Sequence, residues 1–223
     1  MNALSRTLVL TADGSHTVSL PEANITFHSK HGAIQESKHV FIDAGFSYAK
    51  TVFPGEALSI LEIGFGTGLN AFLTAIEALS MEQPIRYTAI DIHPLDMVTT
   101  TALNYPDKLG HEDLFNAIQL SPWNSSSPIH ERFTLEKDIA DLMEFTCREQ
   151  FHLVYFDAFS PEAQPELWTE EIFERLAGCM FPGASLVTYC SKSIVRRALK
   201  DAGWKVAKLP GPRGKREMVR ATI

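Results

Sequence analysis

The sequence of 223 residues has few cysteines, no long apolar run and no overall excess of positive charge. Its cysteines show no C-x-x-C spacing, so we expect neither a disulfide framework nor a zinc site, and we interpret Cys147, Cys179 and Cys190 as small buried apolar residues. The lone histidines lack partners at ligand spacing, so no metal is predicted. No stretch approaches the roughly 18 apolar residues of a membrane helix, and the first residues lack the layout of a secretion signal. These absences predict a cytoplasmic globular chain without a membrane partner.

Positive charge is concentrated at the C-terminal end of the chain. Residues 190–223 carry ten basic and two acidic side chains, a net charge of +8, whereas the rest carries ten basic and 25 acidic side chains, a net charge of −15. Nucleic-acid phosphates are bound by clustered lysines and arginines. The segment therefore predicts a polyanion-binding surface, with a solvated helix face and an exposed edge strand as the alternative.

Turn signals and hydrophobic periodicity divide the chain into two parts. Alternating apolar and polar residues around Asp13-Gly14 predict a β-hairpin over residues 7–20, and residues 34–42 form an amphipathic element of mixed period. From residue 57 onward, short apolar runs alternate with helical patterns. The expected strands are 58–63, 87–91, 133–136, 153–157, 185–189, 205–209 and 217–222, and the expected helices are 69–79, 95–103, 139–147, 170–179 and 194–202.

Strands that alternate with helices predict a Rossmann-like α/β fold, in which a doubly wound, mostly parallel sheet is covered on both faces. The last two expected strands are joined by a connection too short for a helix, so they form an antiparallel hairpin at the sheet edge. The prediction is a seven-stranded sheet with one antiparallel edge strand in a main domain of residues 51–223, preceded by a hairpin extension of residues 1–50. Residues 107–130 are expected to hold a helix at 112–120 and then a loop.

A buried strand leads into a glycine-rich turn at residues 58–70, LSILEIGFGTGLN. Gly64, Gly66 and Gly68 let the backbone turn sharply and let a ligand approach the next helix. Their G-x-G-x-G spacing differs from the G-x-G-x-x-G of dinucleotide sites. Glu62 precedes them, and its carboxylate would repel a pyrophosphate but attract a cation. These features favour S-adenosylmethionine, which carries a sulfonium and an ammonium group and no phosphate, and Phe65 of the turn is part of the expected site.

Acidic residues end the next two expected strands. Asp91 lies about 20 residues past the glycines, where a carboxylate can accept hydrogen bonds from both ribose hydroxyls. Asp138 ends the third strand and could accept a hydrogen bond from the adenine amino group, or cap a following helix. Asn70, in the helix after the glycines, completes the expected cofactor-binding residues.

The fourth expected strand ends at Asp157 and continues into residues 157–168, DAFSPEAQPELW. In a doubly wound sheet this strand end lies beside the first, across the crevice in which ligands bind. Asp157 is therefore expected to face the methyl donor, unless it only caps its own loop.

These motifs resemble the methyltransferase domain of the bacterial tRNA 5-methylaminomethyl-2-thiouridine biosynthesis protein, MnmC. The resemblance runs from about residue 25 to the C-terminus, and it implies the class I fold of S-adenosylmethionine-dependent methyltransferases. It rests on residues 33–41 (AIQESKHVF), 61–70 (LEIGFGTGLN), 91–95 (DIHPL), 157–161 (DAFSP), 165–168 (PELW) and 214–218 (GKREM).

The resemblance implies methyl transfer to the primary amine of 5-aminomethyl-(2-thio)uridine at the tRNA wobble position, which gives 5-methylaminomethyl-(2-thio)uridine. The amine must lose a proton before it attacks, and Asp157 with Phe159 beside it is the catalytic candidate, as a base or as an orienting acceptor. Gln164 stands where family members often have asparagine, which puts the positioning of the base in question. Many members carry a fused flavin-dependent oxidase. Because this chain ends at Ile223, we expect its aminomethyl uridine to be made by another enzyme.

Basic residues in the loop between the last two expected strands are predicted to contact the anticodon region of tRNA. They are Arg213, Lys215 and Arg216. Two other functions stay open: methyl or aminopropyl transfer to a small-molecule amine, and a non-catalytic tRNA-binding module. A small acceptor does not need the basic segment, and the intact glycine turn and strand-end acids argue against a vestigial site.

Overall fold

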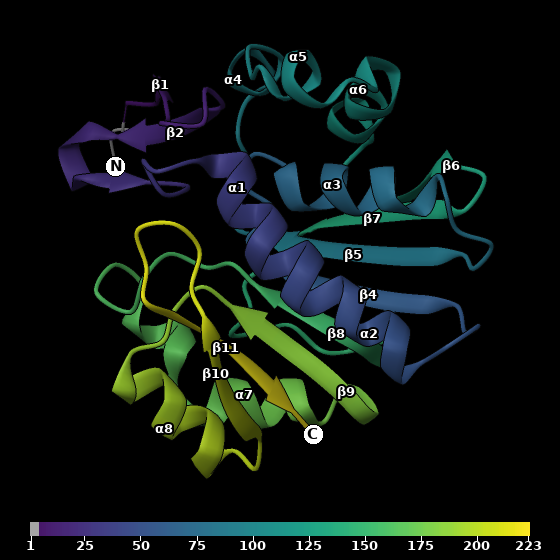
Figure 1. Cartoon of the computed structure of the whole chain (residues 1–223), viewed down its shortest axis with the longest axis vertical. Helices are drawn as coiled ribbons and strands as arrows, with labels where there is room; N and C mark the ends of the chain where they lie inside the picture. The colour runs from purple at the N-terminus through teal and green to yellow at the C-terminus, as the bar shows by residue number, and fades with distance from the viewer. Residues whose placement is uncertain (1–4) are drawn as a thin grey trace.

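A central sheet of eight strands organises the chain (Figure 1), in a computed structural model that describes residues 5–223. The strand at one edge of the sheet runs antiparallel to its neighbour, and next to the strand at the other edge lies a second antiparallel strand. Five neighbouring strands are parallel, in the spatial order β7 (Phe133–Ile139), β5 (Ile85–Asp91), β4 (Leu58–Ile63), β8 (Phe151–Phe156) and β9 (Met180–Thr188). The doubly wound, mostly parallel sheet predicted from the sequence is confirmed.

The two edges of the sheet differ. β6 (Ser125–His130) pairs antiparallel with β7, and this eighth strand was not predicted. At the other edge β11 (Glu217–Thr222) runs antiparallel to both β9 and β10 (Lys205–Pro210). β10 therefore points in the same direction as the parallel strands, and the turn at residues 211–216 lies at their carboxyl edge, where doubly wound folds bind ligands.

Helices cover both faces of the sheet, as strand alternation requires. Leu58 and Ile60 of β4 face one apolar core, and Leu61 and Ile63 face the other. The first core is covered by α3 (Leu69–Ala78), α5 (Tyr105–Leu109) and α6 (Glu112–Leu120), and the second by α7 (Glu170–Ala177) and α8 (Ser193–Asp201). No helix among residues 5–223 is both long and apolar enough to span a bilayer.

One continuous helix lies across the first face. It comprises α1 (Ala33–Ser37), a π-helical stretch η2 (Lys38–Phe46) and α2 (Ser47–Val52). The wider turn of a π-helix explains why residues 34–42 show no clean helical period. Gly45 allows the close approach to the sheet, because a Cβ there would lie 2.8 Å from a Val187 methyl group.

The N-terminal hairpin is confirmed and belongs to a small separate sheet. β1 (Thr7–Leu10) pairs with β2 (His16–Leu20), and after the short helix η1 (Pro21–Ala23) a third strand, β3 (Ile25–Thr26), pairs with β2. Asn104, which precedes α5 and follows α4 (Met97–Thr101), accepts the His16 N–H at 2.7 Å, so this sheet is tied to the main body. The division of the chain at residue 50 stays a prediction.

The expected helix at residues 139–147 is wrong. β7 continues through Ile139, which is paired with Asp91 of β5, and the Ala140 N–H then bonds to the Asp91 carbonyl. These pairings keep the backbone extended where the helix would have to begin, and residues 140–149 form irregular turns.

The interpretation of the cysteines is also corrected. Cys147 and Cys179 form a disulfide, with their Cα atoms 5.8 Å apart, whereas Cys190 is free and buried as expected. The partners are separated by 32 residues, so local spacing could not reveal the pair. The bond links the 140–149 segment to the end of α7.

Candidate active site

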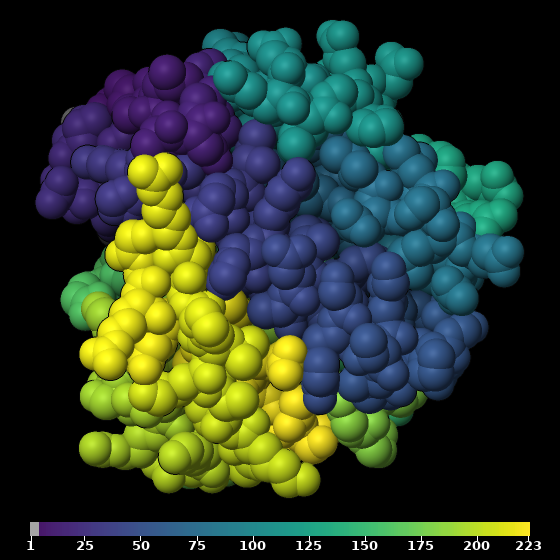
Figure 2. Space-filling view, in the orientation of Figure 1, coloured from purple at the N-terminus to yellow at the C-terminus, as the bar shows by residue number. Residues whose placement is uncertain are grey.

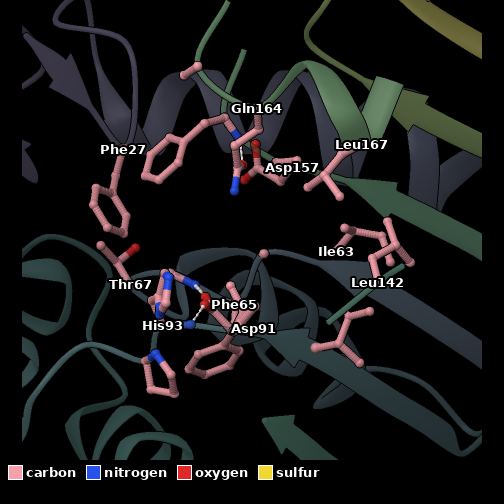
Figure 3. Close-up of a pocket in the computed structure, with 18 of the residues that line it drawn as sticks. Phe27, Ile63, Phe65, Thr67, Asp91, His93, Leu142, Asp157, Gln164 and Leu167 are labelled. Carbon is pink, nitrogen blue, oxygen red and sulfur yellow. Dashed lines mark hydrogen bonds between the residues drawn. The ribbon is translucent and has the colours of Figure 1, made fainter. Parts of the chain in front are cut away.

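A cavity of about 940 Å³ opens at the carboxyl ends of β4, β5 and β8. Figure 3 shows Asp157 and Gln164 on one side of it and Asp91 and Phe65 on the other. Seven of the residues predicted from sequence line it: Gly64, Phe65, Gly66, Asn70, Asp91, Asp157 and Phe159. The crevice beside the first strand is thus a real space of ligand size.

The glycine turn needs its glycines. Gly64, Gly66 and Gly68 all have positive φ angles, of 88°, 51° and 73°. A Cβ on Gly64 would lie 2.9 Å from the Asp157 carbonyl oxygen, so side chains at this position would separate β4 from β8. Gly68 does not line the cavity; it caps α3, and its missing side chain makes room for the Phe65 ring.

Asp91 organises the two loops that border the cavity. One carboxylate oxygen accepts the Gly66 N–H at 2.9 Å, and the other accepts the His93 N–H at 2.8 Å. A carboxylate can accept about four hydrogen bonds, so Asp91 retains acceptor capacity toward a ligand.

Asn70 joins two carboxyl groups. Its side-chain N–H bonds reach Glu62 Oε1 and Asp157 Oδ2, each at 2.8 Å. Glu62 itself is fully buried and does not line the cavity, because the alternation of β4 turns its side chain under α3 with Leu58 and Ile60. The sequence placed Glu62 beside a bound cation, and the structure places it behind Asn70.

Burial controls the protonation of both carboxyl groups. Removal from water raises the pKa of Glu62 well above its usual range, and the hydrogen bond from Asn70 opposes this. The pKa of Asp157 is likewise raised by burial and lowered by Asn70, with the nearby charge of Glu36 raising it further. A carboxyl group with a raised pKa at the end of β8 is suited to take a proton from a ligand near neutral pH.

The segment after Asp157 is held in place from three sides. Gln164 Oε1 accepts the Phe159 N–H at 2.9 Å, and the indole N–H of Trp168 donates to the Phe159 carbonyl at 2.8 Å. The Tyr189 hydroxyl donates to the Ala158 carbonyl at 2.9 Å. Gln164 thus supplies the acceptor for this loop, and Trp168 anchors it from η3 (Pro165–Trp168).

The N-terminal sheet supplies one wall, which the sequence did not reveal. Phe27 meets Phe159 edge to face, with 5.1 Å between ring centroids, and its ring would be 3.1 Å from a Cβ on Gly66. Arg6 donates to the Pro94 carbonyl at 3.2 Å, and so ties the same sheet to the loop after β5. Phe27 follows the two-residue strand β3, and an apolar residue at such a position gives no local sequence signal for a ligand-binding site.

A buried lysine supports the glycine turn from behind. Lys137 Nζ donates to the carbonyls of Ile118 and Gln119 at 3.0 and 3.2 Å, at the end of α6. It also lies 5.2 Å from the centroid of the Phe65 ring and 5.1 Å from that of Trp123. Burial lowers the pKa of Lys137 to about 8. This lysine fixes the ring of Phe65 against the cavity.

The third acidic position differs from the expected one. Asp138 lies on β7, on the same face of the strand as Glu136 and Thr134, and does not line the cavity. Asp141 does line the cavity, and it belongs to the irregular segment found where the helix was expected. The alternative role of Asp138 as a helix cap is wrong, because β7 continues through Ile139 and no helix begins within residues 139–149.

The basic residues of the 211–216 turn separate into two kinds. Arg213 and Arg216 are exposed, but Lys215 Nζ lies 2.7 Å from Glu36 Oε1. Figure 2 shows this turn as a yellow projection beside the N-terminal part of the chain. Within residues 5–223, no group of three or more histidines, cysteines or acidic residues could hold a metal ion.

Comparisons with known proteins match this arrangement. A family model described as S-adenosyl-L-methionine-dependent methyltransferase matches residues 115–223. The tRNA 5-methylaminomethyl-2-thiouridine biosynthesis bifunctional protein MnmC of Nitrosospira multiformis is 30% identical over 210 residues, which cover 88% of this chain and 34% of the relative. The chain spans about a third of the length of the curated relatives it matches.

Solved structures agree. The crystal structure of MnmC2 from Aquifex aeolicus matches with a TM-score of 0.79 at 26% identity, covering 99% of this chain and 70% of that chain. Spermidine synthase from Thermotoga maritima shares the fold, with a TM-score of 0.61 at 14% identity, covering 100% of this chain and 70% of that one. Residues 115–223 therefore match the S-adenosyl-L-methionine-dependent methyltransferase family model, and the chain as a whole is similar to MnmC proteins.

Proposed function

We propose that this chain binds S-adenosylmethionine and methylates the primary amine of 5-aminomethyl-(2-thio)uridine at the wobble position of tRNA. The observation that carries the proposal is the position of Asp157, a half-buried carboxyl group that lines the cavity across from the glycine turn and Asp91. The kinship with MnmC proteins supports the tRNA nucleoside as acceptor. A tRNA substrate is also the basis for proposing a cytoplasmic location.

The residues around the cavity fit this donor. The side chains that line it include four carboxyl groups, those of Asp91, Asp141, Asp157 and Glu166, against the single guanidinium of Arg6. Arg6 is itself engaged by Asp96 at 3.6 Å, and burial lowers the pKa of His28 so that its ring is neutral near pH 7. A cavity of this charge suits a sulfonium and an ammonium and disfavours a pyrophosphate.

Three parts of the cavity would hold the donor. The turn from Gly64 to Gly66 leaves its backbone open, and Asp91 is placed to accept the ribose hydroxyls. We propose Asp141 for the adenine amino group, because it lines the cavity, which Asp138 does not. When bound, the donor supplies a methyl group on positively charged sulfur.

Asp157 prepares the amine for attack. An alkylammonium ion has no free lone pair, so one proton passes to the Asp157 carboxylate and then to solvent. The amine nitrogen forms the new N–C bond while the electron pair of the broken C–S bond stays on sulfur. The pKa of Asp157, raised by burial, brings its proton affinity closer to that of the amine. Phe159, with Phe27 beside it, forms the apolar wall that keeps water from this point.

Exposed arginines at the same edge are proposed to bind tRNA. Arg213 and Arg216 lie in the turn that β11 brings to the carboxyl edge, and both are free to meet phosphates in the described structure. Lys215 is left out of this role, because it is already paired with Glu36.

The test is a methylation assay with the purified chain. The substrate is tRNA whose wobble nucleoside carries the aminomethyl group without the final methyl group. It is incubated with labelled donor, digested and analysed by nucleoside mass spectrometry. We expect conversion of the aminomethyl nucleoside to the methylaminomethyl nucleoside, with loss of turnover of 100-fold or more in Asp157→Asn but donor affinity within a few-fold. A parallel reaction with putrescine and spermidine tests a small acceptor, and methylation of these alone would contradict the proposal. Donor binding without transfer to either acceptor would also contradict it.

A further inference from the structure

A single amide group controls the position of the Asp157 carboxyl group. The side-chain nitrogen of Asn70 has two N–H bonds, and the structure uses both, one to Glu62 Oε1 and one to Asp157 Oδ2. Asn70 is 3% exposed and belongs to α3, whose position is fixed by packing on the sheet. A substitution at Asn70 therefore removes a hydrogen bond from Asp157 Oδ2, which belongs to the carboxyl group proposed to take the amine proton.

Glu62 is placed to hold Asn70 and not to touch a ligand. Its side chain has no exposed surface and does not line the cavity. Glu62 Oε2 and Asn70 Oδ1 are both buried without a hydrogen-bond partner among the described residues, and the unpartnered Tyr87 hydroxyl is buried in the same core. Burial raises the pKa of Glu62, and its Oε1 accepts the hydrogen bond that holds the Asn70 amide in place.

We propose that Asn70 is a positioning residue for methyl transfer that acts through Asp157, and that Glu62 serves the reaction by holding Asn70 rather than by binding the donor. The inference rests on the proposed function. It gives new roles to two residues that the sequence had placed in the cofactor site. Proton transfer itself is unchanged: the amine proton goes to Asp157 and then to solvent.

The surroundings of Asp157 make Asn70 the group that favours its charged form. The charged and titratable groups around Asp157 and Glu62 come from several elements: Glu36 of α1, Tyr87 and Asp91 of β5, Tyr105 of α5, Tyr189 after β9, and Lys215 of the 211–216 turn. Burial and the Glu36 carboxylate favour the protonated form of Asp157, and Asn70 and Lys215 oppose them. Loss of the Asn70 hydrogen bond should therefore raise the pKa of Asp157.

The sign of that shift gives a pH test. Methyl transfer needs the Asp157 carboxylate, so its rate rises with pH through the Asp157 pKa. In Asn70→Ala we expect the acidic limb of the kcat profile to move to higher pH. We also expect a fall of tenfold or more in kcat on the plateau, because the Asp157 oxygen is no longer held in place. Glu62→Leu, which frees Asn70, should shift the limb in the same direction by less. Glu62→Gln retains an oxygen that can accept from Asn70 and should behave like the parent protein.

Measurement of donor binding distinguishes a positioning role of Asn70 and Glu62 from the cofactor-binding role expected from the sequence. Donor affinity, measured by calorimetry, should stay within about threefold of the parent in all three variants. Asn116→Ala and Glu112→Gln, at exposed positions of α6, are matched controls and should change neither the pH profile nor the affinity. If Glu62→Gln weakens donor binding tenfold and leaves the pH profile in place, Glu62 binds the donor ammonium and the inference is wrong.

A ligand-free measurement makes failure of the inference distinct from failure of the proposed function. The carboxyl carbon of Asp157 can be titrated by ¹³C NMR, with its signal assigned by its loss in Asp157→Asn. A higher Asp157 pKa in Asn70→Ala supports the coupling even if the tRNA assay shows no turnover, and an unchanged pKa overturns it. Should Asn70→Ala fail to fold, Asn70→Ser retains one donor and should give a shift of the same sign.

Discussion

The ammonium group of Lys215 lies 2.7 Å from a carboxylate oxygen of Glu36 and 3.9 Å from the centroid of the Tyr189 ring. Glu36 is 6% exposed, and its second oxygen accepts the Ser29 N–H at 2.7 Å. The contact joins the 211–216 turn to α1 and to the segment after β9. Lys215 therefore stabilises the turn, while the neighbouring arginines remain available for a partner.

Removal of Lys215 should reduce stability more than removal of an exposed arginine. Lys215→Met leaves the Glu36 charge buried and unpaired, and we expect a loss of about 1–3 kcal/mol, between the values for exposed and buried pairs. Arg213→Met is the control and should lie within about 0.5 kcal/mol of the parent. Urea unfolding with equal m-values gives both numbers, and equal losses would show that the pair contributes little.

The exposed arginines should affect tRNA binding without affecting the fold. In the double variant Arg213→Glu and Arg216→Glu, tRNA affinity should fall, and the slope of log affinity against log salt should shrink by about one for each lost phosphate contact. Arg148→Glu is a matched control, because Arg148 is equally exposed but lies in the irregular segment after β7. An unchanged salt slope in the double variant would place the tRNA surface elsewhere.

Crowding at Gly66 should block the donor site. Gly66→Val and Gly110→Val both place a branched side chain at a positive φ angle, of 51° and 73°, which costs roughly 1–3 kcal/mol of stability in each. Only at Gly66 would the new Cβ meet a neighbour, the Phe27 ring at 3.1 Å, whereas Gly110 faces open space. We expect at least a tenfold loss of donor affinity in Gly66→Val alone, measured by calorimetry at a temperature where both variants are folded.

His28 should make folding stability depend on pH. Burial, the largest cause, lowers its pKa from 6.5 to about 4. Between these values the unfolded chain binds a proton that the folded protein does not, so the contribution is complete above about pH 6.5 and is lost as pH falls toward 4. The shift corresponds to about 3 kcal/mol. The stability difference between the parent and His28→Gln should shrink by this order from pH 7 to pH 4, and a constant difference would contradict the prediction.

The disulfide between Cys147 and Cys179 should be detectable and stabilising. Closure of a 32-residue loop is worth roughly 3–4 kcal/mol in the chain-entropy model. Titration of the unfolded, unreduced protein should find one thiol, that of Cys190, and reduction should lower the unfolding midpoint. Cys190→Ser is the control and should respond to reduction as the parent does. Three free thiols in freshly purified protein would contradict the bond.

Parts of the site that depend on local chemistry were predictable from the sequence. The glycine turn was found because positive φ angles at Gly64 and Gly66 require glycine, and Asp91 was found because it ends a short apolar strand. Asp157 was found from its strand and the DAFSP motif. In each case the signal lies within a few residues of the position that lines the cavity.

Other parts depend on contacts between distant residues. Phe27 reaches the cavity only because the N-terminal sheet folds over the main body, and the pairing of Lys215 with Glu36 joins residues from opposite ends of the chain. Asp141 lines the cavity and Asp138 does not, because pairing of Ile139 with Asp91 extends β7 and removes the expected helix. The contact of Glu62 with Asn70 was not predicted, because strand alternation buries Glu62 under α3 but does not indicate which side chain it meets there.

The reversed direction of β11 separates the 211–216 turn from the strand ends that form the cavity. The cavity is formed by strand ends in the middle of the sheet, whereas the 211–216 turn is a hairpin connection at its rim. A hairpin connection tolerates insertion, shortening and recharging far better than a central strand end does. Substitutions in the 211–216 turn can therefore alter contacts with a partner outside the cavity while the strand ends that form the cavity stay in place.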